Sequence, residues 1–304
     1  MTRVAALDCG TNSIRLLIAD IEGENFREIS RSMEIVRLGQ GVDKTKSFHP
    51  DAIERTLNAL RRFHDDIARR GVSRIRFCAT SATRDATNRQ IFIDGVREII
   101  GIEPEVISGN EEAELSFLGA TRELHRTDGP FLVIDIGGGS TEFVFGSNQV
   151  EAAKSQNIGC VRMSERHFTG APPSPDEIAR AQSDIDQAIN DAAKVVPITE
   201  ARTIIAVAGT ATTVAAAALE LEAYDRYSIH LSRISAAKTH LVSQMFLGMK
   251  RDEISDLGYM HPGRVDVIAG GSLILDRIMH LSGADEFVAS ESDILDGMAW
   301  SLAK

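Results

Sequence analysis

The stretch Val133-Ile134-Asp135-Ile136-Gly137-Gly138-Gly139-Ser140-Thr141-Glu142 decides the fold of this chain. An apolar run ends in an acid, turns on three glycines and two hydroxyl residues, and continues into a second apolar run. Adjacent glycines let a backbone approach a ligand closely, and successive N–H groups in such a turn form an anion-binding nest. Asp135 is placed to hold a hydrated metal ion beside that anion. The pattern predicts a phosphate-and-metal loop; the alternative is a glycine hairpin without a ligand.

A second copy of this pattern lies near the N-terminus, in Leu7-Asp8-Cys9-Gly10-Thr11-Asn12-Ser13-Ile14. Neither copy has the Gly-Lys-Ser/Thr ending of a P-loop, and each leads into β-type sequence instead of a helix. The pattern therefore excludes a Walker or Rossmann loop. Two such hairpins indicate an internal duplication, with two loops facing each other across a cleft.

Composition places the chain among ordinary globular proteins. Its 304 residues correspond to about two domains, and its 43% hydrophobic and 25% charged residues are typical of a soluble protein with a sizeable core. The net charge of −11 argues against nucleic-acid binding. The longest uncharged stretch, 203–219, is broken by Gly209, so we expect no membrane span. The three scattered cysteines and the lack of a signal before Val4 favour a cytoplasmic protein without disulfides or zinc.

The order of the predicted elements repeats once along the chain. Each half begins with three strands and continues with alternating helices and strands, which is the order of a ribonuclease H-like unit. We place the boundary near residue 120, which gives domains 1–120 and 121–304, with the C-terminal helix lying back on the first domain. The predicted strands are 4–8, 14–20, 26–37, 75–79, 105–107, 131–135, 141–145, 151–157, 204–208 and 287–289. The predicted helices are 50–70, the segment after Asp85 to about 100, 110–124, 160–168, 175–195, 210–220, 235–247, 251–257, 263–280 and 293–303.

The best candidate for a catalytic base lies in Ile107-Ser108-Gly109-Asn110-Glu111-Glu112-Ala113-Glu114. Ser108 followed three residues later by Glu111 fits a capping box, which leaves Glu112 to project into the cleft and act on water. A helix N-terminus lowers the basicity of a carboxylate, whereas a bound polyanion raises it. The alternative is that Glu111, Glu112 and Glu114 only complement the helix dipole.

Three further features remain open on the residues alone. Arg84 follows Thr80-Ser81-Ala82-Thr83. Its guanidinium either binds phosphate oxygens through two of its N–H groups or belongs to a surface residue that caps a turn. Gly209-Thr210-Ala211-Thr212-Thr213 is either a third phosphate or nucleotide loop or a close-packed strand-to-helix turn. Glu142 either assists Asp135 with the metal or points to solvent. The eight histidines show no metal-binding spacing.

Together these residues resemble the exopolyphosphatase/guanosine pentaphosphatase (Ppx/GppA) family. The motifs occur in the order of that family and cover essentially the whole chain. They are Asp8-Cys9-Gly10-Thr11-Asn12-Ser13, Ala79-Thr80-Ser81-Ala82-Thr83-Arg84, Ser108-Gly109-Asn110-Glu111-Glu112-Ala113, Asp135-Ile136-Gly137-Gly138-Gly139-Ser140-Thr141-Glu142 and Val265-Asp266-Val267-Ile268-Ala269-Gly270-Gly271.

The resemblance implies an α/β protein with two ribonuclease H-like domains of the acetate and sugar kinase/Hsc70/actin superfamily facing across a cleft. It implies an exopolyphosphatase that releases terminal orthophosphate from inorganic polyphosphate with Mg²⁺, and that uses Glu112 as its general base. The substrate phosphates would be held by Gly10, Thr11, Asn12, Ser13, Arg84, Gly137, Gly138, Gly139, Ser140 and Thr141. Our candidate metal ligands are Asp8, Asp135 and Glu142.

The resemblance carries further expectations. Longer members continue into helical C-terminal domains, whereas this sequence stops at Lys304, so we expect a short form that favours short polyphosphate chains. Family members are commonly dimers, so we expect a homodimer, and we expect closure about a hinge near Gly119.

Three alternatives to the exopolyphosphatase remain at this point. One is hydrolysis of guanosine pentaphosphate, which presents the same terminal phosphoryl group. Another is an ATP-dependent sugar or acetate kinase of the same fold, in which the Ser108 to Glu112 segment has no evident role. The last is a non-enzymatic, actin-like filament or nucleotide-gated scaffold.

Overall fold

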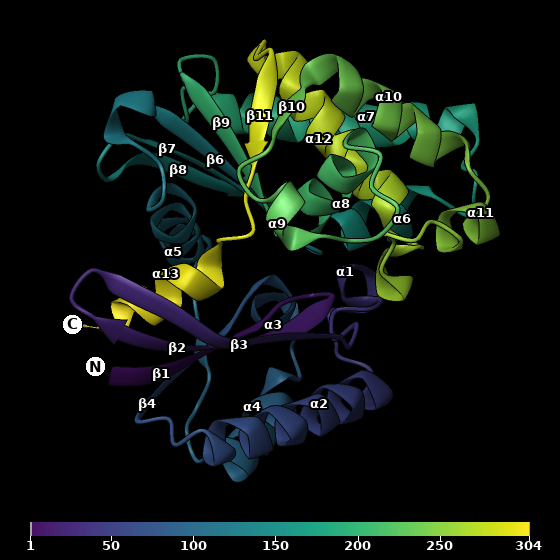
Figure 1. The fold of residues 1–304 in the computed structure, drawn as a ribbon. Helices are drawn as coiled ribbons and strands as arrows, with labels where there is room; N and C mark the ends of the chain where they lie inside the picture. The colour runs from purple at the N-terminus through teal and green to yellow at the C-terminus, as the bar shows by residue number, and fades with distance from the viewer. Residues whose placement is uncertain (1, 304) are drawn as a thin grey trace. The chain divides into compact units, whose positions relative to one another are not determined.

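A computed structural model describes residues 2–303 of the chain. The described residues form two compact units. One comprises the residues up to Gly119 together with those from Ile294 onward, and the other runs from Ala120 to Asp293. The chain therefore passes between the units twice, and the first unit is built from both ends of the sequence (Figure 1).

The first unit contains a mixed sheet of five strands in the order β3-β2-β1-β4-β5. The strands β1 (Thr2–Cys9), β2 (Ser13–Glu22) and β3 (Asn25–Ile35) form an antiparallel meander, and β4 (Arg74–Ala79) and β5 (Glu105–Val106) run parallel to β1. The central strand β1 is a nearly continuous apolar run because both faces of the sheet are covered.

Helices cover each face of this first sheet (Figure 1). Successive side chains of β1 point to opposite faces: Ala5 and Leu7 pack with α2 (Pro50–Arg69) and α4 (Arg89–Ile100). Val4 and Ala6 pack with α5 (Gly109–Thr121) and the C-terminal helix α13 (Ile294–Ser301). The short helices α1 (Val42–Thr45) and α3 (Ser81–Asp85) complete the unit.

The second unit repeats this topology. Its sheet has the order β10-β11-β9-β6-β7-β8, in which β6, β7 and β8 form the antiparallel meander and β9 and β11 run parallel to β6. The strands are β6 (Phe131–Ile136), β7 (Thr141–Gly146), β8 (Val150–Gln156), β9 (Thr203–Val207), β10 (Arg233–Ser235) and β11 (Glu286–Ala289). Because the order 3-2-1-4-5 of the first sheet recurs as 8-7-6-9-11, the predicted pair of ribonuclease H-like units is confirmed.

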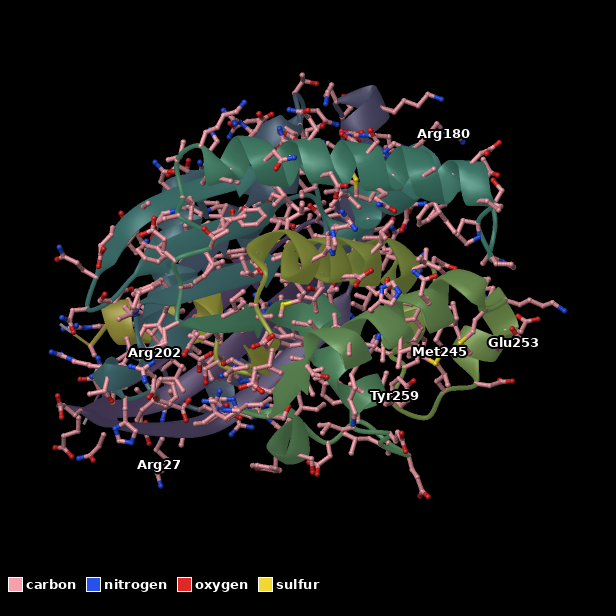
Figure 2. The ribbon with its side chains drawn as sticks, turned by 90° about the horizontal axis from the view of Figure 1, so that it is seen from above. Arg27, Arg180, Arg202, Met245, Glu253 and Tyr259 are labelled. Atoms are coloured by element: carbon pink, nitrogen blue, oxygen red, sulfur yellow. The ribbon has the colours of Figure 1, made fainter. Side chains whose placement is uncertain are left out.

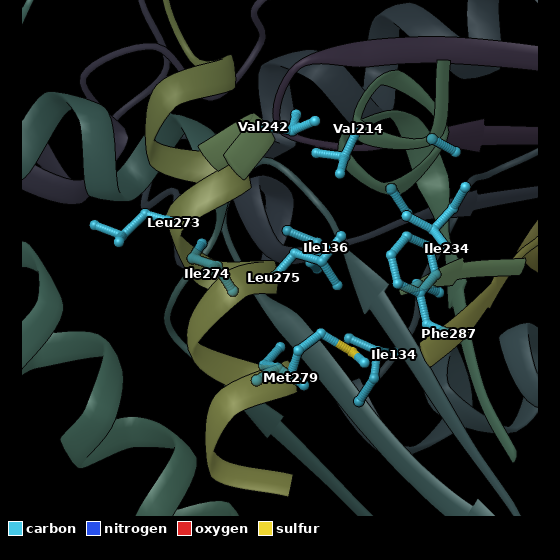
Figure 3. Packing of buried hydrophobic residues seen from close by; sticks show 14 of the residues in the cluster. Ile134, Ile136, Val214, Ile234, Val242, Leu273, Ile274, Leu275, Met279 and Phe287 are labelled. Atoms are coloured by element: carbon cyan, nitrogen blue, oxygen red, sulfur yellow. The ribbon is translucent and has the colours of Figure 1, made fainter. Parts of the chain in front are cut away.

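The long helix α12 (Ile268–Ser282) forms the centre of the second core. Its buried side chains Leu275 and Met279 lie against Ile134 and Ile136 of β6 (Figure 3). The other helices of this unit are α6 (Cys160–His167), α7 (Pro175–Ala193), α8 (Ala208–Ala218), α9 (Arg226–Ile229), α10 (Ala236–Gly248) and α11 (Arg251–Ser255). Charged side chains such as Arg180 of α7 and Glu253 of α11 lie exposed at its surface (Figure 2).

The structure differs from the sequence prediction at a few short elements. The strand β10 was not predicted, because three residues are too few to show an alternating pattern. The helix expected from residue 263 begins at Ile268, since Pro262–Arg264 form a separate 3-10 turn. The helices α1, α3 and α9 were also not predicted. Within residues 2–303, no helix combines the length and the hydropathy that crossing a membrane requires.

Candidate active site

The first glycine loop joins β1 to β2, and two of its carbonyl groups accept hydrogen bonds from the segment 36–39 that packs against it. The Gly10 N–H donates to the Ser13 carbonyl (3.0 Å), which closes the turn. The Thr11 carbonyl accepts from the N–H of Gly39 (2.9 Å), and the Asn12 carbonyl accepts from those of Val36 (3.0 Å) and Arg37 (2.9 Å). In a trans peptide the C=O and the following N–H point in opposite directions. The N–H of Asn12 is therefore directed away from segment 36–39.

The second glycine loop has the same closure, with the Gly137 N–H donating to the Ser140 carbonyl (3.0 Å). Here backbone N–H groups at the N-terminus of α6 donate hydrogen bonds to two carbonyls of the loop. Gly137 O accepts from the N–H of Cys160 (2.9 Å), and Gly138 O accepts from those of Val161 (2.9 Å) and Arg162 (3.0 Å). The N–H groups of Gly138 and Gly139 consequently point away from α6, as an anion-binding nest requires.

Cross-strand pairing places a different partner beside the acid of each loop. Asp8 lies opposite Arg15, whose Nε (3.0 Å) and Nη2 (2.6 Å) both donate to one Asp8 oxygen. At the equivalent position of the second unit, Asp135 lies opposite Glu142, and these residues are 6% and 1% exposed. Ser155 donates to Glu142 (2.7 Å). The first acid thus lies opposite an arginine that binds it, whereas the residue opposite the second acid is another carboxylate.

These acids differ in how well they fit a divalent cation. Residues directly opposite each other on neighbouring strands project from the same face of the sheet, so two such carboxylates can supply oxygen ligands to one cation. Mg²⁺ typically takes one or two carboxylates and completes its shell with water and substrate phosphates. Asp135 and Glu142 fit that donor set, whereas Arg15 competes with a cation for Asp8. Among the described residues, no group of three or more Asp, Glu, His or Cys side chains gathers as a metal site.

The structure brings the candidate base and the candidate phosphate-binding arginine together. Arg84 on α3 donates through Nη1 to Glu112 (2.7 Å) and to the Ile107 carbonyl (2.9 Å). Glu112 lies in the first turn of α5 and is only 8% exposed. The pair fixes the position of the Glu112 carboxylate and keeps a cation beside it. The sequence analysis considered Glu112 and Arg84 one at a time, and their direct contact was not predicted.

The neighbouring acid Glu111 has a structural role. The Ser108 hydroxyl accepts the Glu111 N–H (3.2 Å), which is one half of the predicted capping box. The Glu111 carboxylate accepts a hydrogen bond from Arg76 (2.7 Å). These contacts account for Glu111 without a catalytic function.

A group of buried hydroxyls lies beside the first loop. Thr11 and Ser81 share a hydrogen bond (3.0 Å), and Thr80 and Thr83 are also buried. The Thr80 N–H donates to the Cys9 carbonyl (3.1 Å), which fixes the start of α3 against the loop. The sequence motif contained these hydroxyls, but only the tertiary contact associates them with the loop.

The turn before α8, which the sequence left open as a third ligand loop, is closely packed. A Cβ atom at Gly209 would lie 2.4 Å from the guanidinium of Arg264. Arg264 donates to the Thr213 hydroxyl (3.0 Å), and Thr213 donates to the Gly209 carbonyl (2.7 Å). These contacts describe a close-packed strand-to-helix turn.

Comparison with known proteins gives the family. The model of the Ppx/GppA phosphatase family matches residues 17–303. The chain belongs to the Ppx/GppA phosphatase family. The resemblance drawn from the motifs is therefore confirmed.

Relatives of this Ppx/GppA chain match it over its whole length. It is 45% identical to Exopolyphosphatase 2 of Mycobacterium tuberculosis, with 100% of this chain and 99% of the relative covered. The crystal structure of an exopolyphosphatase-like protein has 44% identity and a TM-score of 0.96, covering 99% of this chain and 97% of that one. An exopolyphosphatase from Cytophaga hutchinsonii has 25% identity and a TM-score of 0.92, covering 99% and 98%.

Proposed function

We propose that this Ppx/GppA family member is an exopolyphosphatase that hydrolyses the terminal phosphoanhydride bond of inorganic polyphosphate. The full-length similarity to proteins named exopolyphosphatase supports this function. The observation that carries it is the repeated loop. In each unit a buried acid is the next-to-last residue of the first strand, and a glycine turn follows. Carbonyls of the turn accept hydrogen bonds from a neighbouring segment, so that amides on the opposite side remain for phosphate oxygens.

The phosphate-binding groups are the amides and hydroxyls of both loops together with Arg84. Residues Thr11 to Ser13 and Gly138 to Ser140 present N–H and O–H donors to non-bridging phosphate oxygens. Gly10 and Gly137 instead use their N–H groups to close the turns, and the Thr141 hydroxyl donates to the Ile158 carbonyl, which corrects the expectation that these three residues bind phosphate through those groups. Arg84, which pairs with Glu112 in the absence of substrate, turns its guanidinium onto a phosphate when the polyanion enters. That exchange releases the Glu112 carboxylate to accept a hydrogen bond from water.

The reaction is a displacement at the terminal phosphorus. The water oxygen forms a bond to that phosphorus, and the bond from phosphorus to the bridging oxygen breaks. Glu112 takes the proton of the attacking water, and the polymer leaves one phosphate shorter. Positioning and charge stabilisation supply most of the rate enhancement in such reactions.

The family is metal-dependent, and we propose Mg²⁺ as the cofactor. Asp135 and Glu142 would hold it, and Asp8 contributes only if its contact with Arg15 loosens. When bound, the ion offsets the negative charge of the substrate phosphates.

We also propose that the protein is a cytoplasmic homodimer. The three cysteines are buried and unbridged, which is consistent with a reducing compartment. The dimer follows from the family resemblance alone, and analytical ultracentrifugation tests it: a sedimentation coefficient that remains monomeric at micromolar concentration would refute it.

The deciding experiment measures orthophosphate release with Mg²⁺ from short and long polyphosphate, guanosine pentaphosphate and ATP. Wild type is compared with Glu112→Gln, which keeps the shape of the side chain and removes the base, and with Glu114→Gln. Glu114 is an exposed acid of the same helix and serves as the matched control.

We expect release from polyphosphate by wild type and Glu114→Gln, and a loss of at least about 10²-fold in Glu112→Gln, at the lower end of general-base contributions. Full activity in a folded Glu112→Gln protein would refute the assignment of the base. Release from guanosine pentaphosphate only, or transfer from ATP to an acceptor, would replace the proposed activity by one of the alternatives.

A further inference from the structure

The carbonyl of Gly139, at the tip of the second glycine loop, has a side chain as its donor. The Nε of Arg162 donates to it at 2.6 Å. Arg162 lies in the first turn of α6 and is only 6% exposed, and Gly139 is buried as well. A hydrogen bond from a charged donor is both shorter and stronger than a neutral one. The guanidinium is thus held against the loop backbone.

This contact determines the direction of the next amide. Because the Gly139 carbonyl points toward Arg162, the N–H of Ser140 points the opposite way. It therefore continues the series begun by the N–H groups of Gly138 and Gly139. The carbonyls that share peptides with those two N–H groups, Gly137 O and Gly138 O, accept hydrogen bonds from backbone N–H groups of α6. The three amides point to the same side of the loop only as long as Arg162 holds the last carbonyl.

Glycine at position 139 makes this restraint necessary. A residue without a Cβ rotates its peptide at little steric cost, so the 139–140 peptide has little intrinsic preference for one orientation. If it turned over, the Gly139 carbonyl would replace the Ser140 N–H on the ligand side and would repel a phosphate oxygen. In the first unit the corresponding carbonyls accept hydrogen bonds from backbone N–H groups of segment 36–39, so their orientation does not depend on a side-chain donor.

We propose that Arg162 is a positioning residue that aims the Ser140 amide at the substrate phosphate. Arg162 itself stays behind the loop and acts through the 139–140 peptide. The inference rests on the proposed function, because it takes the second loop as part of the polyphosphate site. Its effect is on substrate binding: an amide turned away weakens the hold on phosphate before the reaction begins, so KM rises more than kcat falls.

The test compares Arg162→Gln and Arg162→Lys with Arg166→Gln. Arg166 lies one turn further along α6 and pairs with Asp184 of α7 (2.7 Å), so its variant removes the same charge from the same helix and leaves the Arg162–Gly139 hydrogen bond in place. Arg162→Lys keeps the charge but lacks the Nε donor. The kinetic constants for short polyphosphate with Mg²⁺, and Tm as a check of folding, are measured for each.

We expect KM to rise at least about tenfold in Arg162→Gln, as the loss of a charge-assisted hydrogen bond predicts, with kcat within about threefold. Arg162→Lys should still show a rise of at least about fivefold, and Arg166→Gln should stay within about twofold. A KM for folded Arg162→Gln equal to that of Arg166→Gln, or full rescue by lysine, would overturn the inference. If Arg162→Gln does not fold, the lysine variant decides.

The tripolyphosphate affinity of the same variants, measured by calorimetry, separates this inference from the proposed function. An inactive wild type would refute the exopolyphosphatase activity, while a selective loss of tripolyphosphate affinity in the Arg162 variants would still support the positioning role. Equal affinities in all variants would overturn that role whether or not the enzyme is active.

Discussion

Gly159 offers the sharpest test of the second loop, because it lies directly beneath the loop backbone. A Cβ atom at this position would lie 2.4 Å from Gly138 O, 2.5 Å from Gly138 C and 2.6 Å from the Gly139 nitrogen. An ordinary contact begins near 3.4 Å, so Gly159→Ala must displace the loop or α6 by about 1 Å. All three obstructing atoms are backbone, so no rotamer change relieves the clash.

A displacement of about 1 Å in a group that positions a substrate costs on the order of 10²-fold in rate, and overpacking of this kind costs about 1–3 kcal/mol of stability. We therefore expect kcat/KM of Gly159→Ala to fall by about 10²-fold and Tm to decrease. The assay is orthophosphate release from short polyphosphate, with thermal unfolding measured on the same samples.

The matched control for this test is Gly170→Ala, since a Cβ at Gly170 meets nothing within 4 Å. That variant should keep wild-type activity and stability. If a folded Gly159→Ala protein keeps kcat/KM within threefold of Gly170→Ala, the second loop does not bind substrate in the arrangement described, and the argument from its amides fails.

Three further predictions address the first unit, the metal and pH. Arg84→Met removes the guanidinium that we propose to move from Glu112 onto a substrate phosphate, and it should lower kcat/KM at least about tenfold. Arg89→Met, at an exposed position of α4, should not, and equal effects would refute the proposed role of Arg84. Glu142→Gln should raise the Mg²⁺ concentration for half-maximal activity at least about tenfold, and an unchanged Mg²⁺ titration would place the ion elsewhere. Hydrogen bonds from Ser174 and the adjacent loop lower the pKa of Glu177 from 4.5 to about 2. A depressed pKa stabilises the folded state above the unfolded value and loses that effect as pH falls toward 2. The Tm difference between wild type and Glu177→Gln should therefore shrink between pH 7 and pH 3, and a constant difference would contradict this reasoning.

The sequence was sufficient to predict most of the fold because its signals are local. The three-strand start of each half shows in apolar runs bounded by turns, and helices such as α2 show in the spacing of their buried residues. Short elements such as α1 and β10 were missed because three or four residues carry no periodicity. Their conformation is set by neighbours distant in the sequence.

The sequence was sufficient to name candidate residues and loops for the site, but not the hydrogen bonds between them. Motifs identified both glycine loops, Glu112 and Arg84, since each has a recognisable local pattern. The pairing of Arg84 with Glu112 joins residues 28 positions apart, and the contact of Arg162 with Gly139 joins residues 23 apart. Such contacts depend on how elements pack, and nothing in the local sequence of Arg162 distinguishes it from a surface arginine of an amphipathic helix.

The two-ended construction of the first unit has a consequence for how the protein is made. Ile294, Leu295 and Met298 of α13 are at most 2% exposed and complete the core on one face of that sheet. A ribosome therefore produces the strands of this unit before the second unit, and the helix that covers them after it. Until α13 emerges, Val4 and Leu17 have no α13 side chains to pack against, whereas the sequence of the second unit is by then complete. The core of the first unit thus depends on a helix that is made after the second unit, and nascent chains that end before α13 would present an apolar sheet face to chaperones.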